Sequence, residues 1–205
     1  MLTASVFQPL LLSADIALAK FPGTRYQGSK AKLVDWIWDR IKDLEFDTCL
    51  DAFGGTGAVA YRLKQEGKQV TYNDILRFNY YIGVALIENS AMQLTTDDVD
   101  WILARHVDID YPDFIAKTFH DIYFTDAENV WLDQIVTNIN TITDRYKFAL
   151  AFFALAQAAI VKRPYNLFHR KNLYVRLADV ERSFGNKASW DRPFAAWFCD
   201  FVTEA

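Results

Sequence analysis

The 205-residue sequence has few cysteines and prolines, and no long uninterrupted hydrophobic run. Its two cysteines, Cys49 and Cys199, lie far apart and match neither a zinc nor a disulfide framework, which favours a reducing compartment. The longest apolar run, 148-FALAFFALAQAAIV-161, is 14 residues long, which is too short to span a bilayer and predicts a buried helix. The N-terminal apolar patch has no basic flank and makes a poor signal peptide. We therefore expect a cytoplasmic protein that does not cross a membrane.

The formal net charge of −4 hides an uneven distribution. Residues 161–192 hold eight Lys or Arg against three Asp or Glu, a local charge of +5 that leaves −9 for the remainder. The acidic total argues against a general nucleic-acid binder, whereas the basic block favours a localised anionic partner. Aromatic residues interleave with these cations, a mixture suited to phosphate contact and base stacking. An ordinary solvated face is the alternative.

Hydrophobic spacing predicts the order of the secondary structure. A buried strand is expected at residues 46–51 and a second strand at 69–73, and the sequence from 95 to 163 has helical spacing in three or four pieces. Further helices are expected at residues 29–44 with Ser29 as N-cap, at 58–66 before Gly67, and at 76–88. After Pro164 the periodicity is lost in a basic, loop-rich tail. The fold class is therefore α/β with a helical insertion.

The stretch 51-DAFGGTGAVAYRL-63 is a glycine loop between a predicted strand and a predicted helix. Within it, 55-GTGAVA-60 fits the G-x-G-x-x-A pattern of dinucleotide sites, and Asp74 stands where an acid would meet a ribose. Nicotinamide and S-adenosylmethionine sites both use such an acid. Asp51 distinguishes the two kinds of site. Its negative charge would repel a pyrophosphate charge about 4 Å away by roughly 4 kcal/mol at an effective dielectric near 20. The ammonium and sulfonium of S-adenosylmethionine would instead be attracted. A strand–helix turn without a ligand remains the third possibility.

A second candidate site lies upstream, in 25-RYQGSKAKL-33. Gly28 and Lys30 at a predicted helix N-terminus form an anion site suited to the ligand's α-carboxylate. Tyr26 could stack on the ligand's adenine. A Lys30 that is simply solvated is the alternative.

RYQGSK, DAFGGTG and YND, in that order, resemble the amino-terminal half of D12-class adenine-specific DNA methyltransferases, the N6-adenine enzymes that include the Dam methylases. The resemblance covers roughly residues 23–89 and continues more loosely through 161–194. It implies a partial Rossmann-like, S-adenosylmethionine-dependent methyltransferase fold. The implied parts are a cofactor-binding part at 23–92, a helical insertion at 93–162 and a basic DNA-contacting segment at 163–205. The implied cofactor-binding residues are Tyr26, Gly28, Lys30, Asp51, Phe53, Gly54, Gly55, Gly57 and Asp74.

By the same resemblance, target recognition falls in the basic tail, on double-stranded DNA. The candidate DNA-binding residues there are Lys162, Arg163, Arg170, Lys171, Arg176 and Arg182. The family's catalytic tetrapeptide, D/N/S-P-P-Y/F/W, has no counterpart, because the five prolines are never adjacent. No catalytic residue is therefore assigned, and the chain ends before the strands that would precede that motif.

Three hypotheses follow. The first is the S-adenosylmethionine-binding portion of a DNA adenine-N6 methyltransferase, inactive alone, whose catalytic half comes from another polypeptide or is missing by truncation. The second is a non-catalytic DNA-binding relic, and the third is a nicotinamide-dependent oxidoreductase. Because two parallel strands cannot cover their own edges, we expect an exposed apolar surface that a complementary polypeptide or a second copy covers.

Overall fold

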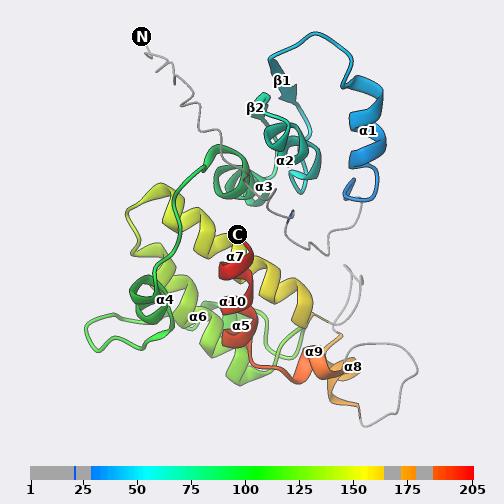
Figure 1. Cartoon of the computed structure of the whole chain (residues 1–205). Helices are drawn as coiled ribbons and strands as arrows, with labels where there is room; N and C mark the ends of the chain where they lie inside the picture. Colours follow the sequence, from blue (N-terminus) through cyan, green and yellow to red (C-terminus); the bar gives the residue numbers. More distant parts are fainter. Residues whose placement is uncertain (1–20, 22–28, 164–171, 179–186) are drawn as a thin grey trace.

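The computed structural model describes Phe21 and residues 29–163, 172–178 and 187–205 (Figure 1). Five of the candidate site residues fall outside these ranges: Tyr26, Gly28, Arg170, Lys171 and Arg182. No helix formed by the described residues combines the length and the hydropathy of a membrane span.

The two predicted strands are confirmed, each somewhat shorter than expected. The expectation that the first is buried is wrong: its residues alternate between exposed and half-buried, because among the described residues only one neighbouring strand pairs with it. β1 (Thr48–Asp51) and β2 (Gln69–Tyr72) pair in parallel, with Thr48 opposite Gln69 and Asp51 opposite Tyr72. The crossover between them is α2 (Ala58–Gln65), as a parallel pair requires. The carboxyl ends of both strands therefore lie at the same edge of the sheet, next to the start of α2.

The first helix, α1 (Val34–Ile41), begins later than the spacing predicts, and Ser29 as its N-cap is wrong. Leu33 occupies the N-cap position and makes no side-chain cap. The Ser29 hydroxyl accepts a weak hydrogen bond from the Ala31 amide and lies 3.2 Å from the Thr56 hydroxyl. Ser29 therefore bridges to the glycine loop, and does not cap a helix.

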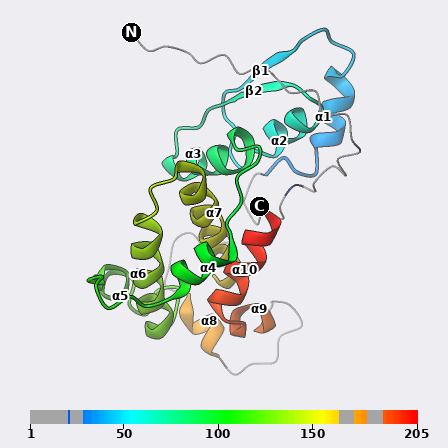
Figure 2. The same cartoon turned by 60° about the vertical axis from the view of Figure 1, so that its left-hand side comes forward.

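The helix predicted at 76–88 consists of α3 (Arg77–Gly83) followed directly by a π-helical turn, η1 (Val84–Glu88). Both lie on α7 (Arg145–Lys162), the long apolar helix of the second half (Figures 1 and 2). α7 supplies Phe153 to the core beneath the sheet and Ala154 to the core of the helical part. Because α7 is buried on two sides, its sequence is apolar almost throughout and lacks the polar face of an amphipathic helix.

The helical pieces predicted between 95 and 163 are confirmed as α4 (Thr96–Leu103), α5 (Phe114–Thr118), α6 (Asp126–Asn140) and α7. Capping boxes begin α4 and α6, in which Thr95 pairs with Asp98 and Thr125 with Glu128. Asp144 caps α7 by accepting the amides of Tyr146 and Lys147. Local sequence signals thus set where these helices start.

The prediction of a loop-rich tail after Pro164 is wrong for the part of the tail that the structure describes. Residues 172–178 and 187–205 form α8 (Leu173–Leu177), α9 (Lys187–Asp191) and α10 (Phe194–Glu204). α10 packs along α7 and buries Phe194, Phe198 and Phe201 in the helical core. These residues stand at helical spacing, a signal that the basic charge of the preceding segment obscured.

Candidate cofactor site

The glycine loop connects the end of β1 to the start of α2. Gly55 and Gly57 adopt left-handed backbone conformations, with φ of +55° and +76°, that residues with a side chain rarely adopt. Gly54 donates its amide to the carbonyl of Asn73, directly after β2. The loop is thus tied to the ends of both strands, and Asp51, the glycines and Asp74 lie at one edge of the sheet.

Asp74 is bound to the glycine loop. Its Oδ2 accepts the Gly55 amide at 2.9 Å, and its Oδ1 accepts the Leu76 amide at 2.9 Å. Partial burial acts to raise the pKa of Asp74, but hydrogen bonds from Leu76, Gly55 and the Asn79 side chain outweigh it and hold the pKa below its usual range. Asp74 is therefore an ionised acceptor at neutral pH.

Tyr72, the last residue of β2, shapes the loop from below. Its hydroxyl donates to the Gly55 carbonyl at 2.6 Å. A Cβ on Gly54 would lie 2.0 Å from the Tyr72 ring, and one on Gly83 would lie 2.4 Å from it. Both glycines therefore make room for this ring. The sequence analysis placed Tyr72 in the YND motif but assigned it no role, because its contacts with the two glycines depend on tertiary packing.

Asp51 is partly buried at the N-terminal end of α2. Burial raises its pKa above the ordinary value, and the negative charge of Asp74 acts in the same direction. The Lys30 charge and hydrogen bonds from the backbone of Phe53 and Ala60 oppose this rise. The net effect is a raised pKa, which means that its surroundings disfavour the ionised form of Asp51. A cation bound beside it would stabilise that ionised form.

The upstream motif reaches the same edge of the sheet through Ser29 and the buried Thr56. Lys30 is exposed and lies in a turn before α1, where its carbonyl accepts the Leu33 amide. This corrects the expected place of Lys30, because the first helical turn starts only at Val34. Phe53, at the tip of the glycine loop, is 84% exposed.

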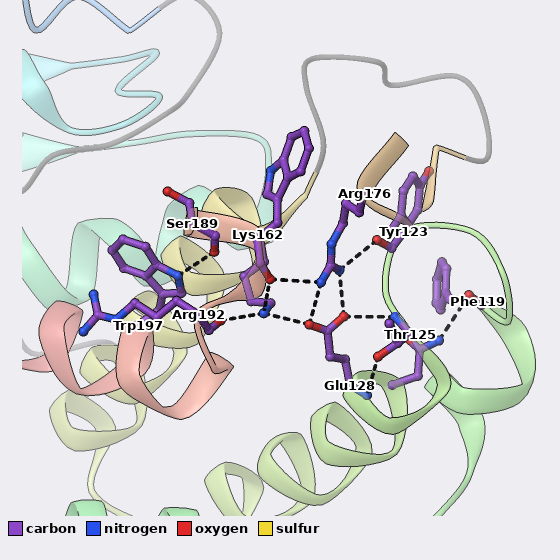
Figure 3. Close-up of polar contacts among 11 residues, drawn as sticks. Phe119, Tyr123, Thr125, Glu128, Lys162, Arg176, Ser189, Arg192 and Trp197 are labelled. Atoms are coloured by element: carbon purple, nitrogen blue, oxygen red, sulfur yellow. Dashed lines mark hydrogen bonds and ion pairs between the residues drawn. The ribbon is translucent and has the colours of Figure 1, made fainter. Parts of the chain in front are cut away.

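Two of the six cations expected to contact DNA are internal instead. Lys162 is 2% exposed, and its ammonium contacts the Glu128 carboxylate at 2.7 Å and the carbonyls of Trp190 and Arg192 (Figure 3). Arg176 forms a two-pronged pair with the same carboxylate, at 2.7 Å for each contact. Charges buried in this way hold α6, α7 and α8 together. The assignment of Lys162 and Arg176 as DNA contacts is therefore corrected.

A third cation of the basic block is also paired within the protein. Arg192 forms an ion pair with Asp200 of α10 and stacks over Trp197. The local charge of +5 thus overstates what this segment presents to a partner. The described Lys187 is exposed, and Arg163 is half-buried.

Large apolar side chains around the small sheet face solvent. Leu50 of β1 is 64% exposed and Ile75, just after β2, is 95% exposed, while Trp36 of α1 is also exposed. Among the described residues, β1 pairs with β2 alone, so its other edge has no strand beside it. The expected exposed sheet edge is therefore present in this part of the chain.

Residues 26–108 match the model of the D12 class N6 adenine-specific DNA methyltransferase family, and this part of the chain belongs to that family. The resemblance read from the three motifs is thereby confirmed.

Among individual proteins, the chain is 36% identical over 149 residues to Type II methyltransferase M2.HphI of Haemophilus parahaemolyticus, a match over 73% of this chain and 43% of the relative. It is 28% identical over 140 residues to Type II methyltransferase M.CviAII of Paramecium bursaria Chlorella virus 1, over 62% of this chain and 42% of that relative. The matches thus span less than half the length of either relative. No solved structure matches the chain.

Proposed function

We propose that this chain is the S-adenosylmethionine-binding portion of a DNA adenine-N6 methyltransferase that acts in the cytoplasm. The observation that supports this most strongly is the arrangement of Asp51, the glycine loop and Asp74 at one edge of a parallel sheet. Ligands of open α/β sheets bind at the carboxyl ends of the strands. The match of residues 26–108 to an adenine methyltransferase family supports the choice of cofactor.

In this proposal Asp74 accepts the ribose hydroxyls. Each of its oxygens has two lone pairs, so one hydrogen bond from a backbone amide leaves each oxygen able to accept another. Asp51 attracts the ammonium and sulfonium groups, whose charge would offset its raised pKa. Lys30 pairs with the α-carboxylate. The remaining proposed cofactor contacts are Tyr26, Gly28, Phe53, Gly54, Gly55 and Gly57.

The backbone of Gly55 is not free to hydrogen-bond the ligand through its amide. Its N–H is donated to Asp74, and its carbonyl accepts the Tyr72 hydroxyl. The loop therefore offers the ligand close approach, since glycines lack a Cβ, and Gly55 itself holds Asp74 in place.

We also propose that the catalytic tetrapeptide lies outside these 205 residues, either in a complementary polypeptide or in a part of the protein missing by truncation. These residues include no adjacent prolines, and the open edge of β1 beside exposed Leu50 and Ile75 is suited to further strands. A second copy of this chain could cover the surface but would not supply the motif. We assign contact with duplex DNA to Arg163, Arg170, Lys171 and Arg182, the candidate DNA-binding cations that remain once Lys162 and Arg176 are set aside.

Isothermal titration calorimetry with S-adenosylhomocysteine and with NAD⁺ tests the cofactor assignment. We expect the purified chain to bind S-adenosylhomocysteine, and Asp74→Ala and Lys30→Ala to weaken that binding. Asp108→Ala is the matched control, because Asp108 is an exposed acid far along the chain from the loop. Tighter binding of NAD⁺ than of S-adenosylhomocysteine would overturn the proposal in favour of an oxidoreductase.

A further inference from the structure

The short helix α8 presents two large apolar side chains to solvent. Tyr174 is 68% exposed and Leu177 is 63% exposed. Residues three positions apart lie on the same side of a helix, so these two side chains are neighbours, and we call the pair the α8 patch. Large apolar side chains are stabilised by removal from water, so such a pair at the surface is suited to contact with a partner.

Contacts on another side of α8 fix this helix to the rest of the protein. Leu173 is buried, and its amide donates to the Ile122 carbonyl at 3.0 Å. The Arg176 side chain is only 7% exposed and makes two contacts of 2.7 Å with the Glu128 carboxylate (Figure 3). Arg176 also donates to the Trp190 carbonyl of α9 at 3.2 Å. The α8 patch is therefore exposed on a helix that is firmly anchored.

The charge around the α8 patch is positive. Lys162 and Arg176 share the single carboxylate of Glu128, which leaves one positive charge in excess beneath the helix. The charge of +5 on residues 161–192, less the charges of their partners Glu128 and Asp200, leaves +3. In duplex DNA, phosphates flank base edges and sugars that offer apolar surface in the grooves. This match of charge and apolar surface favours duplex DNA as the partner of the α8 patch.

We propose that the α8 patch is a contact surface for duplex DNA, in which Tyr174 and Leu177 lie against base edges or sugars in a groove. This rests on the proposed function, since it assumes that cations of the basic block contact the phosphates. Apolar contacts to base edges carry sequence information that phosphate contacts do not. Glu128 and Arg176 have a positioning role, because their ion pair holds α8 in place beneath the patch.

Fluorescence anisotropy of a labelled duplex oligonucleotide of mixed sequence, titrated with the full chain, tests this surface. The double substitution Tyr174→Ala and Leu177→Ala should weaken binding by about tenfold, the size of a lost base contact. The slope of log K against log salt concentration should stay unchanged, because no phosphate contact is lost. The melting temperature should also stay unchanged, because both side chains are exposed. These two readouts separate an apolar DNA contact from a charge effect and from unfolding.

Trp36→Ala combined with Leu44→Ala is the matched control. These side chains are 60% and 59% exposed, and they lie in and just after α1, far from α8 (Figures 1 and 2). Their removal should leave the affinity for DNA unchanged.

Arg176→Lys tests the positioning role, because lysine keeps the charge but cannot form the two-pronged contact with Glu128. It should weaken DNA binding without changing the salt slope. In the Tyr174→Ala and Leu177→Ala protein it should add little, because the patch that it positions is gone. If Arg176→Lys unfolds the helical part, the two exposed substitutions still decide the proposal.

The outcomes separate this surface from the proposed function. Unchanged affinity after the double substitution in α8 overturns the α8 patch as a DNA contact. The proposed function still stands in that case if neutralising Arg163, Arg170 and Lys171 reduces the salt slope. If the double substitution weakens association with a complementary polypeptide and leaves DNA binding intact, the patch is a protein interface and the proposal is overturned. A chain that binds no duplex DNA removes the proposed DNA contact and the role of the α8 patch together.

Discussion

The Gly55 amide donates a 2.9 Å hydrogen bond to the carboxylate of Asp74, which is 19 residues further along the chain. This bond joins the loop after β1 to the acid after β2, and the Tyr72 hydroxyl holds the carbonyl of the same glycine. The two halves of the proposed cofactor site therefore form as one unit. A substitution in the glycine loop should therefore alter the position of Asp74, and a substitution of Asp74 should alter the loop.

Gly54→Ala should disrupt this unit. The added Cβ would lie 2.0 Å from the Tyr72 ring, so either the ring or the loop must move. We expect destabilisation by about 1–3 kcal/mol, the usual cost of overpacking, together with weaker binding of S-adenosylhomocysteine. Chemical denaturation and calorimetry measure the two effects. In a Tyr72→Ala background the same substitution should cost clearly less, and an equal cost in both backgrounds would show that the ring is not the obstacle.

Glu128→Gln should destabilise the helical part by about 3–5 kcal/mol, because it leaves the buried charges of Lys162 and Arg176 without their counter-charge. The matched control is Glu88→Gln, which removes an exposed ion pair with Arg145 and should cost at most about 1 kcal/mol. Thermal or urea unfolding compares the two. Equal losses would mean that the Glu128 cluster is no more important than a surface pair.

The same glutamate predicts a pH dependence. Burial acts to raise the pKa of Glu128. Hydrogen bonds from Arg176 and Lys162 outweigh burial and lower this pKa from 4.5 to about 2. A lowered pKa means that the stabilisation, about 3 kcal/mol, is fully present above pH 4.5 and is lost as the pH falls toward 2. Urea unfolding of the unmodified chain should show this acid loss, and Glu128→Gln should show a correspondingly smaller one. Identical acid profiles for the two proteins would contradict this assignment.

Neutralising Arg163, Arg170 and Lys171 should reduce the salt dependence of DNA binding. Each lost phosphate contact lowers the slope of log K against log salt concentration by about 0.9. Lys32, Arg40 and Lys42 form an equally charged, exposed control set in and around α1, whose neutralisation should leave the slope unchanged. A slope unaffected by the first set would make the basic block an ordinary solvated face.

Local chemistry made much of this architecture predictable. The threonines and acids at residues 95–98 and 125–128 start α4 and α6, and Asp144 starts α7, so the helical pieces could be expected from short sequence patterns. The glycine loop and Asp74 were likewise identifiable, because left-handed glycines and an acid after a strand are local features. The resemblance to a methyltransferase family linked these motifs to one cofactor.

Burial and long-range pairing were not predictable in this way. Arg176 and Glu128 are 48 residues apart, and the sequence gives the charge of each without showing that they meet. The two cations paired with Glu128 therefore looked like surface charges in a basic tail. The contact between the Tyr72 ring and Gly54 also depends on tertiary packing, which no periodicity encodes.

The most direct measurement is the transfer of tritiated methyl groups from S-adenosylmethionine to adenine in duplex DNA. The 205-residue chain should transfer none alone, because it lacks the tetrapeptide that accepts hydrogen bonds from the adenine amino group. Adding a polypeptide that carries this motif and the remaining strands should produce turnover, and Asp74→Ala in this chain should reduce it. Robust turnover by the unaccompanied chain would contradict the account, since the catalytic acceptor would then lie among residues to which no such role is assigned.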